Sequence, residues 1–389
     1  MGKAKNLTAL TRRNFLNNTA AAAASIPFLG LPFQEAVHTT EKKASAPLKI
    51  LILGGTSFLG PHQIAIAIER GHEITTFSRG KTKPSFNKEY FDKVESLIGD
   101  REDNLEALKG RKWDVVIDNS GKRVHWTEKT AELLKGAADI YMYISSVSVY
   151  FPYTGNDFSE KRNVVLEIPK GISEESKMDY EYGVMKAKSE QATIKSFGKD
   201  QSIIVRPHFM VGPGDPTNRF IYWPVRLEMG GEVMVPDTGN NLVQYIDVRD
   251  IASWMIHLLE NKISGTFNGA GPGFTMDVRS FVHGAHAAFS SPVSFTYIDD
   301  YDFLEEQEAV FMCPWILPME EYVGMPKATI KKAIANGLKY RPLAETVKDT
   351  INWWHSEDVP EEKRKAFLEG EKSALIKEKE VLKAWKEKR

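Results

Sequence analysis

The sequence predicts an α/β protein: a doubly wound parallel sheet followed by a smaller C-terminal lobe. Two nearly continuous apolar runs, residues 48–53 and 140–144, are typical of strands buried on both faces. Helix-like segments alternate with such runs as far as residue 206, which indicates successive strand–helix–strand units. A glycine-rich turn directly follows the first run. The 389 residues are enough for two lobes.

The boundaries follow from where these patterns change. We expect a signal and linker over residues 1–46, the sheet domain over 47–206, and a lobe interleaved with returns to the sheet over 207–355. A highly charged tail, 356–389, carries an intermittent apolar stripe. Such a stripe is most often a helix docked on its own domain, and a contact in a homodimer is the alternative.

The first segment is expected to be an export signal rather than part of the fold. The pair Arg12 and Arg13 follows a positively charged start and precedes an alanine-rich apolar run at residues 20–31. This order resembles a twin-arginine signal, and the run is too short for a comfortable membrane span. We therefore expect export to the periplasm and no stable membrane span after processing. A chance arginine pair before a short helix is the alternative.

Charge and cysteine content argue against several classes of protein. The formal net charge of −1 gives no basic field to hold a polyanion, so we expect no nucleic-acid partner. Cys313 is the only cysteine, which excludes an intrachain disulfide. Its apolar neighbours indicate packing rather than a reactive thiol. We assign no metal site.

The turn after the first strand predicts a binding site for a dinucleotide. It is followed by a helical pattern and a second strand, and this context distinguishes it from a plain βα turn. Glycines let the backbone approach a pyrophosphate, and the helix N-terminus supplies amide donors. Ser57 stands where a central glycine is usual, so it needs a negative φ or a hydroxyl contact with phosphate. The residues assigned to the cofactor are Gly54, Gly55, Thr56, Ser57, Phe58, Leu59 and Gly60.

The end of the second strand bears on the choice between NAD and NADP. Ser78, Arg79 and Lys81 stand where NAD-selective sites usually have an acid for the ribose hydroxyls. The two cations favour a 2′-phosphate and hence NADP, but NAD stays open because both can be solvated loop charges. Asp100 ends a later strand-like segment. It is expected to accept a hydrogen bond from the adenine amino group or to cap a turn. Ser78, Arg79 and Asp100 are assigned to the cofactor site.

A serine, a tyrosine and a lysine provide candidate hydride-transfer chemistry. Ser146 follows the apolar run at 140–144, and Tyr182 and Lys186 lie four residues apart in a helix-like stretch, hence on one face. We expect the ammonium to lower the pKa of Tyr182, so that the phenol can exchange a proton with a carbinol. Lys186 can also hold the nicotinamide ribose, and Ser146 can bind the reacting oxygen. The order of motifs carries this assignment, since a lone Tyr-x-x-x-Lys pair is weak evidence.

With these motifs the chain resembles the extended short-chain dehydrogenase/reductases of the NAD-dependent epimerase/dehydratase family. The resemblance continues through residues 206–215 (RPHFMVGPGD) and 243–250 (VQYIDVRD). It is strongest for an isoflavone-reductase-like bacterial subgroup, which is similar to chloroplast stem-loop-binding proteins. It implies a Rossmann fold, with Ser146, Tyr182 and Lys186 as the catalytic set. Cofactor contacts are implied for Gly54, Gly60, Arg79, Asp100 and Lys186.

The lobe after residue 206 is expected to bind the substrate. A loop rich in Gly, Pro, Asp and Asn precedes four candidate contacts, and arginines with aromatics suit a phosphate, a sugar face or a carboxylate. An aromatic helix packed on the sheet explains them equally well. These residues are Arg219, Tyr222, Trp223 and Arg226.

The predicted reaction is hydride transfer on a sugar-like or glycoside carbinol. Twin-arginine export carries folded proteins, so the cofactor could leave already bound. Free dinucleotide is scarce outside the cytoplasm. This favours an epimerase- or dehydratase-like cycle in which the hydride returns to the substrate. An NADPH-dependent carbonyl reductase is one alternative. A non-catalytic RNA-binding protein on the same fold is another.

Overall fold

The computed structural model describes residue 44 and residues 46–389, apart from positions 85, 120, 157, 238–240, 320 and 372. The arginine pair and the apolar run of the expected export signal lie outside these residues, so export stays a prediction. Within the described part, no helix combines the length and apolar character that crossing a membrane requires.

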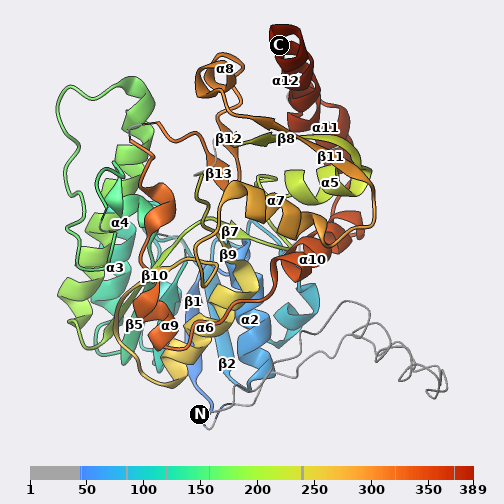
Figure 1. Ribbon diagram of the computed structural model, residues 1–389. Coiled ribbons are helices and arrows are strands. Elements are labelled where there is room, and N and C mark those ends of the chain that lie inside the picture. The colour runs from blue at the N-terminus through green and yellow to red at the C-terminus, as the bar shows by residue number, and fades with distance from the viewer. Residues whose placement is uncertain are drawn as a thin grey trace, which may run out of the picture. The chain divides into compact units, whose positions relative to one another are not determined.

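Seven parallel strands form the central sheet, in the order β10-β6-β5-β4-β1-β2-β3 (Figure 1). This confirms the doubly wound parallel sheet. After residue 206 the chain returns to the sheet and adds β10 at the edge beside β6. The strands are β1 (Lys49–Leu53), β2 (Glu73–Ser78), β3 (Glu95–Ile98), β4 (Val115–Asp118), β5 (Ile140–Ile144), β6 (Ser202–Pro207) and β10 (Gly265–Gly269).

Helices cover both faces of this sheet because its strands are apolar on both faces. In β1, Ile50 and Ile52 belong to the apolar cluster on one face of the sheet, and Leu51 and Leu53 belong to the cluster on the opposite face. All four side chains are fully buried. Figure 1 shows α3 and α4 on one side of the sheet and α2 and α6 on the other. The four helices are α2 (Leu59–Glu69), α6 (Val248–Glu260), α3 (Val124–Leu134) and α4 (Glu174–Phe197).

The second lobe has its own apolar core, built on the parallel strand pair β8 (Gly231–Pro236) and β11 (Val293–Ile298). The charged tail belongs to this lobe, because the apolar stripe of α12, including Val381 and Trp385, is buried in that core. Its helices are α5 (Tyr222–Met229), α7 (Val278–His286), α8 (Tyr301–Glu306), α10 (Leu343–His355), α11 (Glu361–Glu369) and α12 (Ala374–Lys388).

Short elements complete the described chain. They are the strands β7 (Met210–Val211), β9 (Ile246–Asp247), β12 (Phe311–Met312) and β13 (Trp315–Ile316), the helix α9 (Lys331–Ala335), and the 3-10 turns η1 (Lys88–Lys93), η2 (Glu106–Leu108), η3 (Val147–Tyr150) and η4 (Met325–Lys327).

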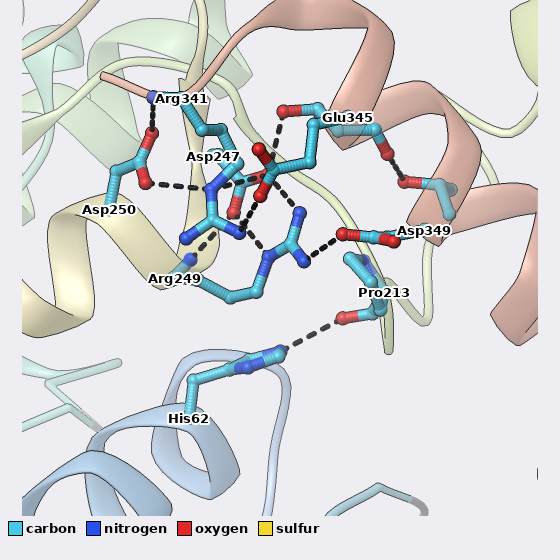
Figure 2. A network of polar contacts seen from close by, with 10 residues as sticks. His62, Pro213, Asp247, Arg249, Asp250, Arg341, Glu345 and Asp349 are labelled. Atoms are coloured by element: carbon cyan, nitrogen blue, oxygen red, sulfur yellow. Dashed lines mark hydrogen bonds and ion pairs between the residues drawn. The ribbon is translucent and has the colours of Figure 1, made fainter. Parts of the chain in front are cut away.

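A buried polar network joins α6 of the sheet domain to the segment before α10 (Figure 2). Asp247 caps α6 by accepting from the Arg249 backbone amide at 2.8 Å, and its carboxylate pairs with the Arg249 guanidinium at 2.7 Å. Arg341, just before α10, pairs with Asp250 at 2.7 Å. The Asp-x-Arg-Asp start of α6 thus serves as a helix cap and in ion pairs. Buried charges of this kind are tolerated because each is paired.

Candidate active site

The glycine turn between β1 and α2 has the geometry that a phosphate cradle needs. Gly54 and Gly55 have φ angles of 99° and 103°, which side chains other than glycine rarely adopt. A Cβ at Gly60 would lie 2.3 Å from the Gly55 carbonyl oxygen, so only glycine lets the helix approach the turn this closely. Ser57 is not among the described non-glycine residues with positive φ. The backbone therefore accommodates serine at this departure from the usual pattern.

The start of α2 is suited to an anion. No side chain caps this helix, and its first turn has no acidic residue, so its amide dipoles are not neutralised locally. The turn lines a cavity of about 370 Å³, and all seven residues predicted from Gly54 to Gly60 contribute to it. Together with the close approach at Gly60, this fits a dinucleotide whose pyrophosphate lies against the turn.

The ends of the next strands form another wall of the cavity. Ser78 ends β2, Arg79 follows it, Asp100 follows β3, and all three line the cavity. Asp100 also caps a local turn, since its Oδ1 accepts from the Glu102 amide at 3.0 Å. Arg79 is exposed, and no carboxylate of the described chain pairs with it within 4.0 Å. Its guanidinium is available for a phosphate group.

Tyr182 and Lys186 lie on α4 and line the same cavity as the glycine turn. Tyr182 is 43% exposed, whereas Lys186 is only 7% exposed and donates from Nζ to the Ile144 carbonyl oxygen at 2.8 Å. Lys186 Nζ lies 5.9 Å from the centre of the Tyr182 ring. Ser146 follows β5 and caps η3; its hydroxyl donates to the Ser148 hydroxyl at 3.0 Å and is close enough to Tyr182 to lower the pKa of that phenol. The structure thus brings together the three residues assigned to catalysis.

The effect of Lys186 on its neighbour differs from the expectation. Burial raises the pKa of Tyr182 above its usual value of 10.0, and hydrogen bonding by Ser146 and the charge of Arg219 offset only part of this. The prediction that Lys186 lowers this pKa is wrong for this arrangement. Burial lowers the pKa of Lys186 itself to about 8, and its ammonium is directed to the Ile144 carbonyl.

Two supports of the site were not identified from the sequence. Gly183 lets α4 pack directly on η3, since a Cβ there would lie 2.3 Å from the Ser148 carbonyl oxygen. Arg101, which lines the cavity, forms a buried bidentate ion pair with Asp118, with N–O distances of 2.5 and 2.7 Å. The charge of Asp118 partly restores the pKa of Lys186. The glycine is visible in the Tyr-Gly-x-x-Lys pattern, but its packing partner is distant in sequence.

The four predicted substrate residues separate into two groups. Arg219 is exposed, lies over the Phe209 ring at 5.6 Å, and is close enough to affect Tyr182. Tyr222 and Trp223 are instead buried in the core of the second lobe. Arg226 is also buried, where it hydrogen-bonds with Glu378 on α12. A substrate role for these three is not supported, because their side chains are enclosed by packing; the alternative of a packed aromatic helix describes them.

A cavity along the carboxyl ends of parallel strands, starting at a glycine turn, defines a dinucleotide-binding α/β protein. The model of the NAD dependent epimerase/dehydratase family matches residues 50–269, so the chain belongs to that family. This confirms the resemblance seen in the motifs.

Individual relatives are more distant. The chain is 28% identical over 233 residues to the chloroplast stem-loop binding protein of 41 kDa b from Arabidopsis thaliana, covering 56% of this chain and 57% of that protein. It is 23% identical to the epimerase family protein SDR39U1 of Bos taurus, and the match covers 63% of this chain and 82% of that protein. Among solved structures, vestitone reductase from alfalfa has a TM-score of 0.56 at 18% identity, covering 79% and 98%. UDP-galactose 4-epimerase has a TM-score of 0.53 at 15% identity, covering 78% and 97%. At these identities the two structures establish the shared fold.

Proposed function

We propose that the protein is an NAD(P)-dependent oxidoreductase that transfers a hydride at a carbinol carbon of a sugar-like or glycoside substrate, and returns it within the same catalytic cycle. The observation that carries this proposal is that Tyr182 and Lys186 line the same cavity as the glycine turn, with Ser146 just after β5. A dinucleotide held at that turn would supply the hydride acceptor and donor.

The chain's own residues would handle the proton. As the carbinol C–H bond breaks and the hydride leaves, the hydroxyl proton passes to Tyr182 in its ionised form. The Ser146 hydroxyl donates to the same substrate oxygen as it becomes a carbonyl. When the hydride returns, Tyr182 gives the proton back to that oxygen. Lys186 is placed to hold the nicotinamide ribose while its charge lies beside the phenol.

Export through the twin-arginine route belongs to the same proposal and rests on Arg12 and Arg13. A protein folded before export can carry its dinucleotide along. A redox-neutral cycle then needs no supply of reduced cofactor outside the cytoplasm.

One experiment tests the reaction type. The purified protein is stripped, its bound dinucleotide is identified, and the reloaded protein is incubated with a panel of glycosides. Reduced nicotinamide is followed by absorbance and products by mass spectrometry. Many turnovers without net cofactor consumption are expected. One product per added reduced cofactor, and none without it, would support the NADPH-dependent carbonyl reductase instead, which the unpaired Arg79 favours as a second candidate.

A variant pair tests the assignment of Tyr182. Tyr182→Phe removes the proton relay and should lower turnover by about 100-fold or more while the dinucleotide stays bound. Tyr90→Phe is the matched control, since Tyr90 hydrogen-bonds with Glu69 and does not line the cavity. Near wild-type turnover by Tyr182→Phe would refute the assignment.

A further inference from the structure

Arg219 differs from most of the described arginines in having no carboxylate partner. Arg101, Arg206 and Arg249, for example, each pair with a carboxylate at 2.5 to 2.7 Å. No Asp or Glu oxygen of the described residues lies within 4.0 Å of the Arg219 guanidinium. An arginine is always charged at physiological pH, so this positive charge is left for solvent or a ligand.

The guanidinium is nevertheless held in place. Its Nε donates to the Thr217 hydroxyl at 2.9 Å, and that hydroxyl donates to Asp215 Oδ1 at 2.6 Å. The same Asp215 oxygen accepts from the Thr217 backbone amide at 2.8 Å. On its other side Arg219 lies over the Phe209 ring, with the guanidinium carbon 5.6 Å from the ring centre. These contacts use Nε and the flat face; no hydrogen bond within the described chain engages the two terminal nitrogens.

Arg219 also lies beside the catalytic end of the cavity. Its supporting Phe209 is followed directly by Met210, which lines that cavity together with Tyr182. The charge of Arg219 is among the influences on the Tyr182 phenol. A substrate that exchanges a proton with Tyr182 therefore reacts close to the charge of Arg219.

We propose that Arg219 binds an anionic group of the substrate, a carboxylate or a phosphate, through its two terminal nitrogens. The proposal rests on the function proposed above and narrows its substrate class to acidic sugars or glycosides. The planar edge of a guanidinium matches the two oxygens of such a group. Phe209, Thr217 and Asp215 act as positioning residues, because they fix the orientation of Arg219.

The test compares probes that differ only in the anionic group, using the full-length protein loaded with dinucleotide. Calorimetry measures the binding of methyl β-glucuronide against methyl β-glucoside, and of glucose 6-phosphate against glucose. We expect at least one anionic probe to bind about 10- to 100-fold tighter than its neutral partner, the usual worth of hydrogen bonds to a charged group. Which of the two pairs shows the preference distinguishes carboxylate from phosphate.

Variants assign the preference to Arg219 and separate it from catalysis. Arg219→Gln should abolish it, and Arg219→Lys should restore part of it. Arg111→Gln is the charge-matched control, because Arg111 forms an exposed ion pair with Glu95 and lies outside the cavity. Tyr182→Phe should keep the preference for anionic probes but lose turnover. Probe binding therefore tests the role of Arg219, and turnover separately tests the hydride-transfer proposal. Equal binding of charged and neutral probes, no binding of any probe at about 10 mM, or an unchanged preference in Arg219→Gln overturns the inference.

Discussion

Gly183→Ala tests whether the contact between α4 and η3 positions the catalytic tyrosine. The added Cβ would lie 2.3 Å from the Ser148 carbonyl oxygen, whereas ordinary contact begins at 3.4 Å. Because that oxygen is backbone, the helix and the turn have to separate by about 1 Å, a shift that can lower turnover by on the order of 100-fold. The overpacking should also cost about 1–3 kcal/mol of unfolding free energy. The dinucleotide should still bind, since Gly54 to Gly60 are untouched.

The assay combines urea unfolding, dinucleotide calorimetry and turnover on a substrate found in the glycoside panel. Gly284→Ala is the control, because Gly284 is also inside a helix but meets only the flexible end of Leu343, at 3.2 Å. Its gain in helix propensity should leave stability equal or up to about 1 kcal/mol higher. If Gly183→Ala is as active and stable as Gly284→Ala, the contact does not position Tyr182.

Two further predictions concern acid stability and cofactor choice. Burial lowers the pKa of His62 to about 4, from an ordinary 6.5. Between these two pH values the unfolded chain therefore binds a proton at His62 that the folded chain does not bind. As pH falls from 6.5 to 4, His62 should lower the free energy of unfolding by about 3 kcal/mol. Urea midpoints across that range should fall less steeply for His62→Gln; an identical slope contradicts the assignment. Arg79→Ala should weaken NADP binding about tenfold and leave NAD unchanged. Tighter NAD than NADP binding by the wild type would contradict the role of Arg79.

The sheet and the cofactor turn could be predicted because their signals are local in the sequence. The run at 48–53 is apolar on both faces, and a strand can satisfy that pattern only between two layers of helices. The glycine turn follows it directly, and the positive φ angles of Gly54 and Gly55 confirm why glycine is needed there. The pairing of Tyr182 with Lys186 likewise follows from helix periodicity alone.

What could not be predicted depends on partners distant in the chain. In the sequence alone Arg226 resembles a ligand-binding arginine. In the structure it hydrogen-bonds with Glu378 on α12, which lies 152 residues further along the chain. Trp223 is equally ambiguous, since an aromatic side chain suits a sugar face or a core. The predicted direction of the Tyr182 pKa shift is wrong because burial outweighs the neighbouring charges. Spacing along a helix indicates which charges are near, whereas desolvation depends on everything packed around them.

The opposite effects of burial on Tyr182 and Lys186 predict how the reaction should depend on pH. With its pKa near 8, Lys186 is mostly charged at pH 7, while the raised pKa of Tyr182 keeps the phenol protonated. Reduction of a carbonyl uses that proton directly, so its rate should be level below pH 7 and fall above about pH 8 as Lys186 loses its charge. Oxidation of a carbinol needs the ionised phenol, so its rate should rise with pH until the loss of the Lys186 charge opposes it. Initial rates of each half-reaction between pH 6 and 9 distinguish the two. Identical profiles in both directions would show that Tyr182 is not the group that exchanges the proton.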